Sequence, residues 1–225
     1  MVTELVLLII GGYLLGSLPA DYLAARWARG IDLRQYGSGS VGITNLGRAT
    51  SRRIAMAVGI FDLVKPMIVV WLAKLTGLDI AGQLIAGLMV VIGHNWSIFL
   101  RFQGGRGIIA TIGLIFILPL LHGMVPWELI IGLTITAIFA FTVRNLPLGV
   151  LFAMGSLPLV SWLVGKPLVF TLGFLALFII MIIRRLALPR SAMAASLSTR
   201  EILVNRFLFD RDIRDRETWL NRTSE

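Results

Sequence analysis

Seven apolar runs, separated by short arginine-containing segments, dominate the sequence and restrict the folds open to it. They lie near residues 2–25, 54–75, 81–100, 108–122, 128–143, 146–164 and 167–183. A helix needs about 20 apolar residues to cross the hydrocarbon core of a bilayer. Only 15% of the residues are charged, against about 25% in soluble domains. We therefore predict an all-α, polytopic membrane helical bundle with about seven transmembrane helices.

The basic residues between these runs predict the orientation of the bundle. Eighteen of the 21 lysines and arginines follow the first, third, fifth or seventh run. Because cytoplasmic loops are enriched in lysine and arginine, we expect the N-terminus outside and the C-terminus in the cytoplasm. We divide the chain into a membrane domain, residues 1–190, and a solvated, partly helical cytoplasmic tail, residues 191–225. This distribution accounts for the net charge of +9, so no nucleic-acid partner is expected.

The residue types present limit the chemistry. The chain has no cysteine, and its two histidines are His94 and His122. Disulfides, thiolate nucleophiles and a three-histidine metal centre are therefore excluded, and we predict neither a metal nor a cofactor. Catalysis must use hydroxyl, carboxylate, imidazole and arginine side chains together with backbone amides.

A glycine-rich segment, residues 36–48, follows the first apolar run. Gly37, Gly39 and Gly42 have the spacing G-x-G-x-x-G, but no strand or βαβ unit precedes them, so a dinucleotide site is not expected. Consecutive glycines let backbone N–H groups converge on an anion. The side chains that add donors or charge are Ser38, Thr44, Asn45 and Arg48. The alternative is an interhelical turn without a ligand.

A second glycine-rich segment precedes the fourth run and consists of Gly104, Gly105, Arg106 and Gly107. Free N–H groups at the start of a helix attract phosphate. Two such segments on one predicted face, each with an arginine, predict an anionic substrate. His94 lies upstream of the second segment, and a packing role and a catalytic role are both open for it.

Two opposite charges lie inside the second run. Asp62 and Lys65 are three residues apart, so a helix places them on one face. An unpaired charge near the bilayer centre costs about 3 kcal/mol, so we expect the two to pair or to reach a polar cavity. A structural ion pair and a substrate-facing lysine are both open.

Together these residues resemble the bacterial membrane glycerol-3-phosphate acyltransferases that use acyl-phosphate as the acyl donor. The resemblance runs from Gly11 to about Thr111 and includes Gly16-Ser17-Leu18-Pro19, the first glycine-rich segment, Asp62 to Lys65, and residues 93–107. It implies transfer of a fatty acyl group from acyl-phosphate to glycerol-3-phosphate, giving 1-acylglycerol-3-phosphate and phosphate in phospholipid biosynthesis. It also implies a multi-pass protein of the bacterial inner membrane with its active site facing the cytoplasm.

The resemblance further implies roles for individual residues. Ser38 and Arg48 would bind and polarise the donor, with His94 as a further catalytic residue. Glycerol-3-phosphate would be held by Gly104, Gly105, Arg106 and Gly107, and the other expected substrate-binding residues are Gly37, Gly39, Gly42, Thr44, Asn45 and Lys65. The expected partners are these two substrates and membrane lipids; no protein partner is indicated.

Two departures from the family pattern leave alternatives open. The family's last helix leads into an Arg-His-x-x-Asn segment, whereas residues 184–190 contain neither histidine nor asparagine. Residues 142–147 also match the family's serine-bearing motif poorly. One alternative is a related chain that has lost catalysis and acts as a membrane binding or assembly protein. A transporter of phosphorylated small molecules is the other, although the two halves show no internal repeat.

Overall fold

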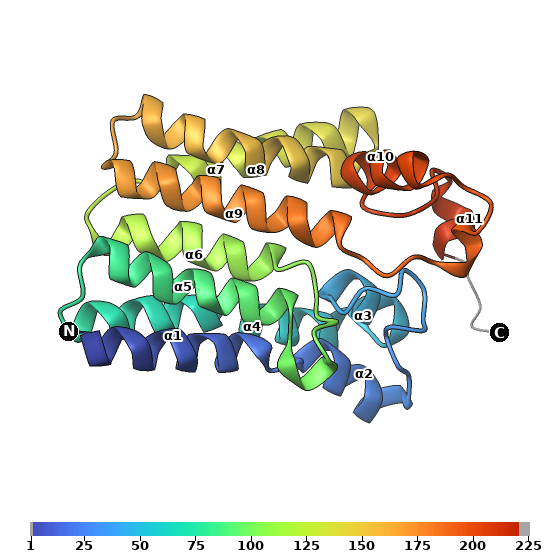
Figure 1. Ribbon diagram of the computed structural model, residues 1–225, viewed down its shortest axis with the longest axis horizontal. Coiled ribbons are helices and arrows are strands. Elements are labelled where there is room, and N and C mark those ends of the chain that lie inside the picture. Colours follow the sequence, from blue (N-terminus) through green and yellow to red (C-terminus); the bar gives the residue numbers. More distant parts are fainter. Residues whose placement is uncertain (1, 221–225) are drawn as a thin grey trace. The chain divides into compact units, whose positions relative to one another are not determined.

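The computed structural model describes residues 2–220, and all the regular elements in that range are helices (Figure 1). Five helical stretches there are long and apolar enough to cross a membrane, and two shorter apolar helices, Ile108–Leu121 and Trp127–Val143, fall on the fourth and fifth predicted runs. The chain forms two compact units. The first extends to Met124 and also takes in Leu220, and the second is Val125–Trp219.

The first unit contains every residue predicted for the site. Its helices are α1 Val2–Ser17, α2 Ala20–Arg29, α3 Ile43–Ala49, α4 Arg52–Leu75, α5 Ile80–Asn95 and α6 Ile108–Leu121, with a 3-10 turn at Ile98–Leu100. Helix α5 packs against α1 and α4, and α4 packs against α6. One apolar core between them is built from Val69, Ala73, Leu78, Ala86 and Val90.

The first predicted span, residues 2–25, is two helices, so its prediction as one helix is wrong. Helix α1 ends at Ser17 and α2 begins at Ala20. Proline lacks an N–H group and disfavours helical geometry in the residue before it, so the chain breaks at Leu18 and Pro19. The break turns the first residues of α2 toward the rest of the unit, where Asp21 is buried.

Helices α1 and α5 approach so closely that their backbones touch. A Cβ atom on Gly16 would clash with the backbone of Val90, so only glycine fits this crossing. The hydroxyl of Ser17 donates to the carbonyl of Gly93 at 3.4 Å, and that of Ser97 donates to the carbonyl of Ser17 at 2.5 Å. The ends of the two helices are therefore joined by direct hydrogen bonds.

The elements of the second unit are α7 Trp127–Ile138, a π-helical turn Phe139–Val143, α8 Leu146–Leu163, α9 Leu168–Leu186, a 3-10 turn Ala192–Ala194, and α10 Thr199–Phe209; α11 Arg216–Leu220 ends the described chain. In this unit three helices, α7, α8 and α9, pack in sequence order, and α10 of the tail packs against α8 and α9. A buried ion pair of 2.6 Å joins Glu128 Oε2 to Lys166 Nζ.

The tail, residues 191–225, was expected to be solvated; in its described part most residues of α10 are exposed, while Ile202 and Arg206 are buried. Arg206 on α10 is 5% exposed, and its Nε lies 2.6 Å from Asp212 Oδ1. The same guanidinium donates to the carbonyls of Leu186 and Pro189. A buried guanidinium needs such partners, and they hold α10 against the end of α9.

Candidate active site

The first glycine-rich segment is organised by the side chain of Asn45. Asn45 lies on α3, so the second half of the segment is a helix rather than the predicted loop. Its amide donates to the carbonyls of Tyr36 at 2.9 Å and Ser40 at 3.1 Å, and its Oδ1 accepts from the N–H of Ser38 at 3.2 Å. These bonds occupy the buried amide, and a direct substrate contact by Asn45 stays a prediction.

The other predicted residues of this segment differ in exposure. Thr44 and Arg48 on α3 are exposed, whereas Ser38 is half-buried and its hydroxyl accepts from the N–H of Ser40 at 3.4 Å. The left-handed backbone at two of the predicted glycines shapes the turn, with φ of 53° at Gly37 and 65° at Gly39. The third predicted glycine, Gly42, is extended and precedes α3. The donors of the segment thus lie along one turn and along α3, where Arg48 is in the last turn.

The second glycine-rich segment precedes a helix, as predicted, because α6 begins at Ile108. The N–H of Gly105 donates to the carbonyl of His94 at 2.9 Å. A Cβ atom on Gly105 would collide with His94 Nε2 and with the carbonyl oxygen of Val41. Gly107 has φ of 67°, a conformation that side-chain-bearing residues rarely adopt. Glycine is therefore required here for close backbone approach.

The two segments meet at a small pocket. Its lining comes from the α1–α2 junction, the first segment, the end of α5 with the turn after it, and the second segment. The lining residues are Gly16, Ser17, Leu18, Pro19, Asp21, Val41, His94, Ser97, Leu100, Gly104 and Gly105. Three predicted site residues, His94, Gly104 and Gly105, are among them. The other predicted site residues do not line this pocket.

Asp62 and Lys65 form the predicted ion pair. Lys65 Nζ lies 2.8 Å from Asp62 Oδ1 and also donates to the carbonyl of Leu18 at 2.8 Å. Both side chains are buried, which fits the structural alternative; a substrate contact by Lys65 stays a prediction. The imidazole of His94 completes the cluster, with Nδ1 3.7 Å from Asp62 Oδ1.

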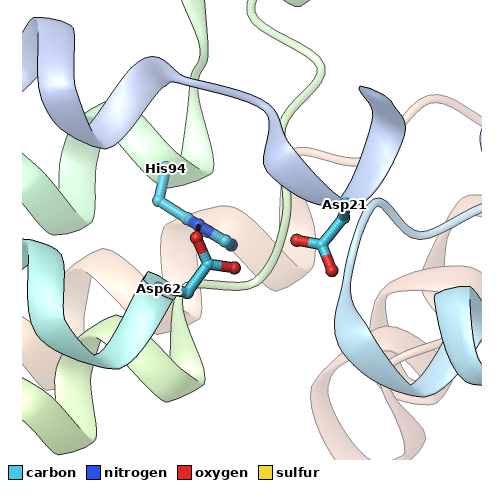
Figure 2. Close-up of side chains that lie close together, drawn as sticks. All are labelled: Asp21, Asp62 and His94. Carbon is cyan, nitrogen blue, oxygen red and sulfur yellow. Dashed lines mark ion pairs between the residues drawn. The ribbon is translucent and has the colours of Figure 1, made fainter. Parts of the chain in front are cut away.

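Asp21 is the residue that reasoning from the sequence missed. Figure 2 shows its carboxylate turned toward Asp62 and His94, which come from two other helices. One ligand atom from each of the three lies within 4.8 Å of the others. Asp21 is 2% exposed, and its Oδ1 has no hydrogen-bond partner among residues 2–220. The available signal was an acid inside the first apolar run.

An ion pair anchors the chain between α2 and the first glycine-rich segment. Arg34 donates to both carboxylate oxygens of Asp32, at 3.0 Å from Nε and 2.7 Å from Nη2. These side-chain hydrogen bonds hold the pKa of Asp32 below its ordinary value. The guanidinium also lies over the ring of Tyr22, 5.2 Å from its centroid, and so ties this connection to α2.

Known proteins match this chain along most of its length. Residues 6–190 match the family described as glycerol-3-phosphate acyltransferase. Glycerol-3-phosphate acyltransferase 4 of Dehalococcoides mccartyi (strain CBDB1) is 40% identical over 224 residues, which cover 97% of this chain and 94% of the relative. A glycerol-3-phosphate acyltransferase of Gloeobacter violaceus (strain ATCC 29082 / PCC 7421) is 41% identical over 168 residues, covering 71% and 77%.

Two solved structures have the same fold. The structure of PlsY, an integral membrane glycerol 3-phosphate acyltransferase, in its glycerol 3-phosphate form gives a TM-score of 0.71 at 28% identity, covering 80% of this chain and 88% of that one. Its lysophosphatidic acid form gives 0.69 at 26% identity, covering 80% and 87%. This chain is therefore a multi-pass membrane protein with an all-helical fold, and it belongs to the glycerol-3-phosphate acyltransferase family.

Proposed function

We propose that this chain transfers a fatty acyl group from an acyl-phosphate to glycerol-3-phosphate. The observation that carries the proposal is the meeting of the two glycine-rich segments, where Val41 and Gly105 touch beside His94. A reaction between two phosphorylated substrates needs two anion-binding segments close together. The named activity of the relatives supports glycerol-3-phosphate as the acceptor.

The reaction needs no covalent enzyme intermediate, because an acyl-phosphate is already an activated anhydride. The terminal hydroxyl oxygen of glycerol-3-phosphate attacks the carbonyl carbon and forms the ester bond. The bond between that carbon and the phosphate oxygen then breaks, and the departing phosphate receives the hydroxyl proton. His94, whose Nε2 faces Gly105, is placed to accept a hydrogen bond from the attacking hydroxyl and to orient it.

The predicted residues divide between the two substrates. We assign Ser38 and Arg48 to the donor, where they stabilise the negative charge that develops on the carbonyl oxygen during attack. The second glycine-rich segment binds the phosphate of the acceptor through a charge-assisted contact from Arg106 and through the first N–H groups of α6, which it precedes. Gly37 and Gly39 shape the turn that carries Ser38, through their left-handed backbone conformation.

Steady-state kinetics on purified variants tests these roles. Arg106→Ala should chiefly raise the KM for glycerol-3-phosphate, because it removes a contact made in both the ground state and the transition state. Ser38→Ala and Arg48→Ala should instead lower kcat, because their donors matter most in the transition state. Loss of one charged hydrogen bond, worth about 1.5–3 kcal/mol, corresponds to about 10- to 150-fold. Arg106→Lys, which keeps the charge, is the control.

Two results would contradict the proposal. If both Ser38→Ala and Arg48→Ala retain wild-type turnover, the first segment is a structural turn. If the folded wild-type protein makes no lysophosphatidate from acyl-phosphate and glycerol-3-phosphate, the alternative of a relative without catalysis is favoured. Comparable turnover with acyl-CoA would reject acyl-phosphate as the specific donor.

We also propose seven crossings, with the N-terminus outside and the C-terminus in the cytoplasm of the bacterial inner membrane. The bundle would comprise residues 1–190, with residues 191–225 as a cytoplasmic tail. The enrichment of arginine in alternate connections supports this orientation. Because the chain has no cysteine, a single cysteine introduced at position 38 or 106 is the only residue that a thiol reagent can label. Its labelling shows on which side of the membrane that position lies. Labelling of either by an impermeant reagent added to intact cells would reverse the proposed orientation.

A further inference from the structure

We propose that Asp21 determines acceptor specificity by accepting a hydrogen bond from the middle, non-reacting hydroxyl group of glycerol-3-phosphate. The inference rests on the proposed function, since it places the acceptor in the pocket beside Gly104 and Gly105. Asp21 comes from α2, outside both glycine-rich segments. It would give the site a contact that recognises the alcohol rather than the phosphate.

The burial of Asp21 is the first observation. The residue is 2% exposed, it lines the pocket, and its Oδ1 accepts no hydrogen bond from any residue in the described range 2–220. A buried acceptor without a partner is costly. A ligand hydroxyl that donates to Oδ1 would remove this cost, so the carboxylate favours a ligand that carries one.

A purely local role does not account for this placement. Asp21 lies in the first turn of α2, where a carboxylate stabilises the helix dipole. That role is fulfilled at a solvated helix end and does not require the acid to be buried. Here the carboxylate is instead turned toward Asp62 and His94 (Figure 2), at the place where three helices converge.

The charges around the pocket match those of the acceptor. Glycerol-3-phosphate has a dianion at one end and neutral hydroxyl groups on its other two carbons. The pocket presents the backbone of Gly104 and Gly105 on one wall, next to Arg106, and the Asp21 carboxylate on another. Oδ1 of Asp21 is a hydrogen-bond acceptor, so it pairs with a hydroxyl group that donates and not with a phosphate dianion, which has no proton to donate. This arrangement orients the acceptor with its phosphate at the glycine-rich segment.

Asp21, Asp62 and His94 also form a set of ligand atoms for a cation, but the neighbouring charge argues against that occupant. Lys65 Nζ is 2.8 Å from Asp62 Oδ1, so a divalent ion would lie beside an ammonium group and be repelled by it. A hydroxyl group is neutral and leaves the ion pair intact. Asp62, moreover, does not line the pocket, whereas Asp21 and His94 do.

The test compares two acceptors with the purified full-length protein. Glycerol-3-phosphate is compared with 3-hydroxypropyl phosphate, which lacks only the middle hydroxyl, with palmitoyl-phosphate as donor. The wild type should prefer glycerol-3-phosphate by about 5- to 150-fold in kcat/KM, the range for leaving one buried acceptor without a partner. Asp21→Ala should remove this preference by lowering the value for glycerol-3-phosphate, and leave the analogue within about threefold of wild type. Asp21→Asn keeps a carbonyl acceptor, so its preference for glycerol-3-phosphate should lie between that of the wild type and that of Asp21→Ala.

Asp62→Asn is the matched control, because it alters a carboxylate of the same cluster that does not line the pocket. It should lower activity on the two acceptors by the same factor. The proposal is overturned if Asp21→Ala lowers both by the same factor, or if Asp62→Asn removes the preference as Asp21→Ala does. It is also overturned if EDTA abolishes wild-type activity and Mn²⁺ restores it only while Asp21 is present.

Calorimetric titration of the two alcohol phosphates in detergent, without an acyl donor, separates this inference from the proposed function. Wild-type protein should bind glycerol-3-phosphate more tightly than the analogue by about the same factor as in turnover, and Asp21→Ala should bind the two equally. Absence of turnover together with this binding pattern would reject acyl transfer and keep the Asp21 contact. Equal binding of both compounds by the wild type would reject the contact.

Discussion

Replacement of Asn45 tests how the first glycine-rich segment is held in shape. Its amide donates to the carbonyls of Tyr36 and Ser40 and its Oδ1 accepts from the N–H of Ser38. Asn45→Ala leaves these groups without that partner, and a buried unsatisfied group costs about 1–3 kcal/mol. Tyr36 is exposed and the two serines are half-buried, so water can form some of the hydrogen bonds that Asn45 no longer makes. We therefore expect a destabilisation of about 2–4 kcal/mol, well below the full sum of these costs.

The assay is thermal unfolding in detergent, followed by circular dichroism, together with amide hydrogen exchange across residues 36–42. Faster exchange confined to this range would show that the loss is local. Asn45→Asp keeps the acceptor for Ser38 but sets a carboxylate against three carbonyls, those of Leu33, Tyr36 and Ser40. It should therefore destabilise at least as much as Asn45→Ala at pH 7. Thr44→Ala, at the exposed neighbour, is the control and should stay within about 0.5 kcal/mol of wild type. An Asn45→Ala variant as stable as this control, with unchanged exchange, would refute the reasoning.

Two further predictions concern packing and charge in the first unit. Gly16→Ala places a Cβ atom against the backbone of Val90, so it should lower the free energy of unfolding by about 1–3 kcal/mol as over-packing does; an unchanged unfolding temperature would show that α1 and α5 can separate at no cost. Because Arg34 lowers the pKa of Asp32, the pair stabilises the fold fully above the ordinary Asp pKa of about 3.9 and less as pH falls through the lowered pKa. The stability difference between wild type and Asp32→Asn should therefore be constant from pH 7 to pH 5 and shrink in stronger acid, and a difference that grows on acidification would contradict this.

The helices were predictable because length and hydropathy are local properties. The apolar runs 54–75 and 146–164 coincide within two residues with α4 and α8. The spacing of Asp62 and Lys65 likewise sufficed to predict their pairing, since three residues along a helix return to the same face.

The features that escaped prediction depend on contacts between segments distant in sequence. The run 2–25 is continuous in hydropathy, and only the backbone restriction at Pro19 divides it. Asp21 then meets His94, more than seventy residues away, because the break redirects α2. The periodicity of apolar residues within one helix cannot predict a contact between side chains of two different helices. The helix α3 was missed because it is short and two glycines, Gly42 and Gly47, stand at its start and inside it, a pattern typical of a turn.

The hydrogen bonds that join Ser17, Gly93 and Ser97 have a mechanical consequence. They connect the end of α1 to the end of α5 and to the 3-10 turn beyond it, so this side of the pocket moves as one body. The opposite side includes Val41, within a connection whose hydrogen bonds to Asn45 are partly open to solvent. If a substrate enters this pocket as proposed, displacement of residues 36–42 should admit it more readily than separation of the helices. Residues 36–42 would then take part both in substrate entry and in binding of the acyl donor. A substitution that makes this segment more rigid should therefore slow both steps.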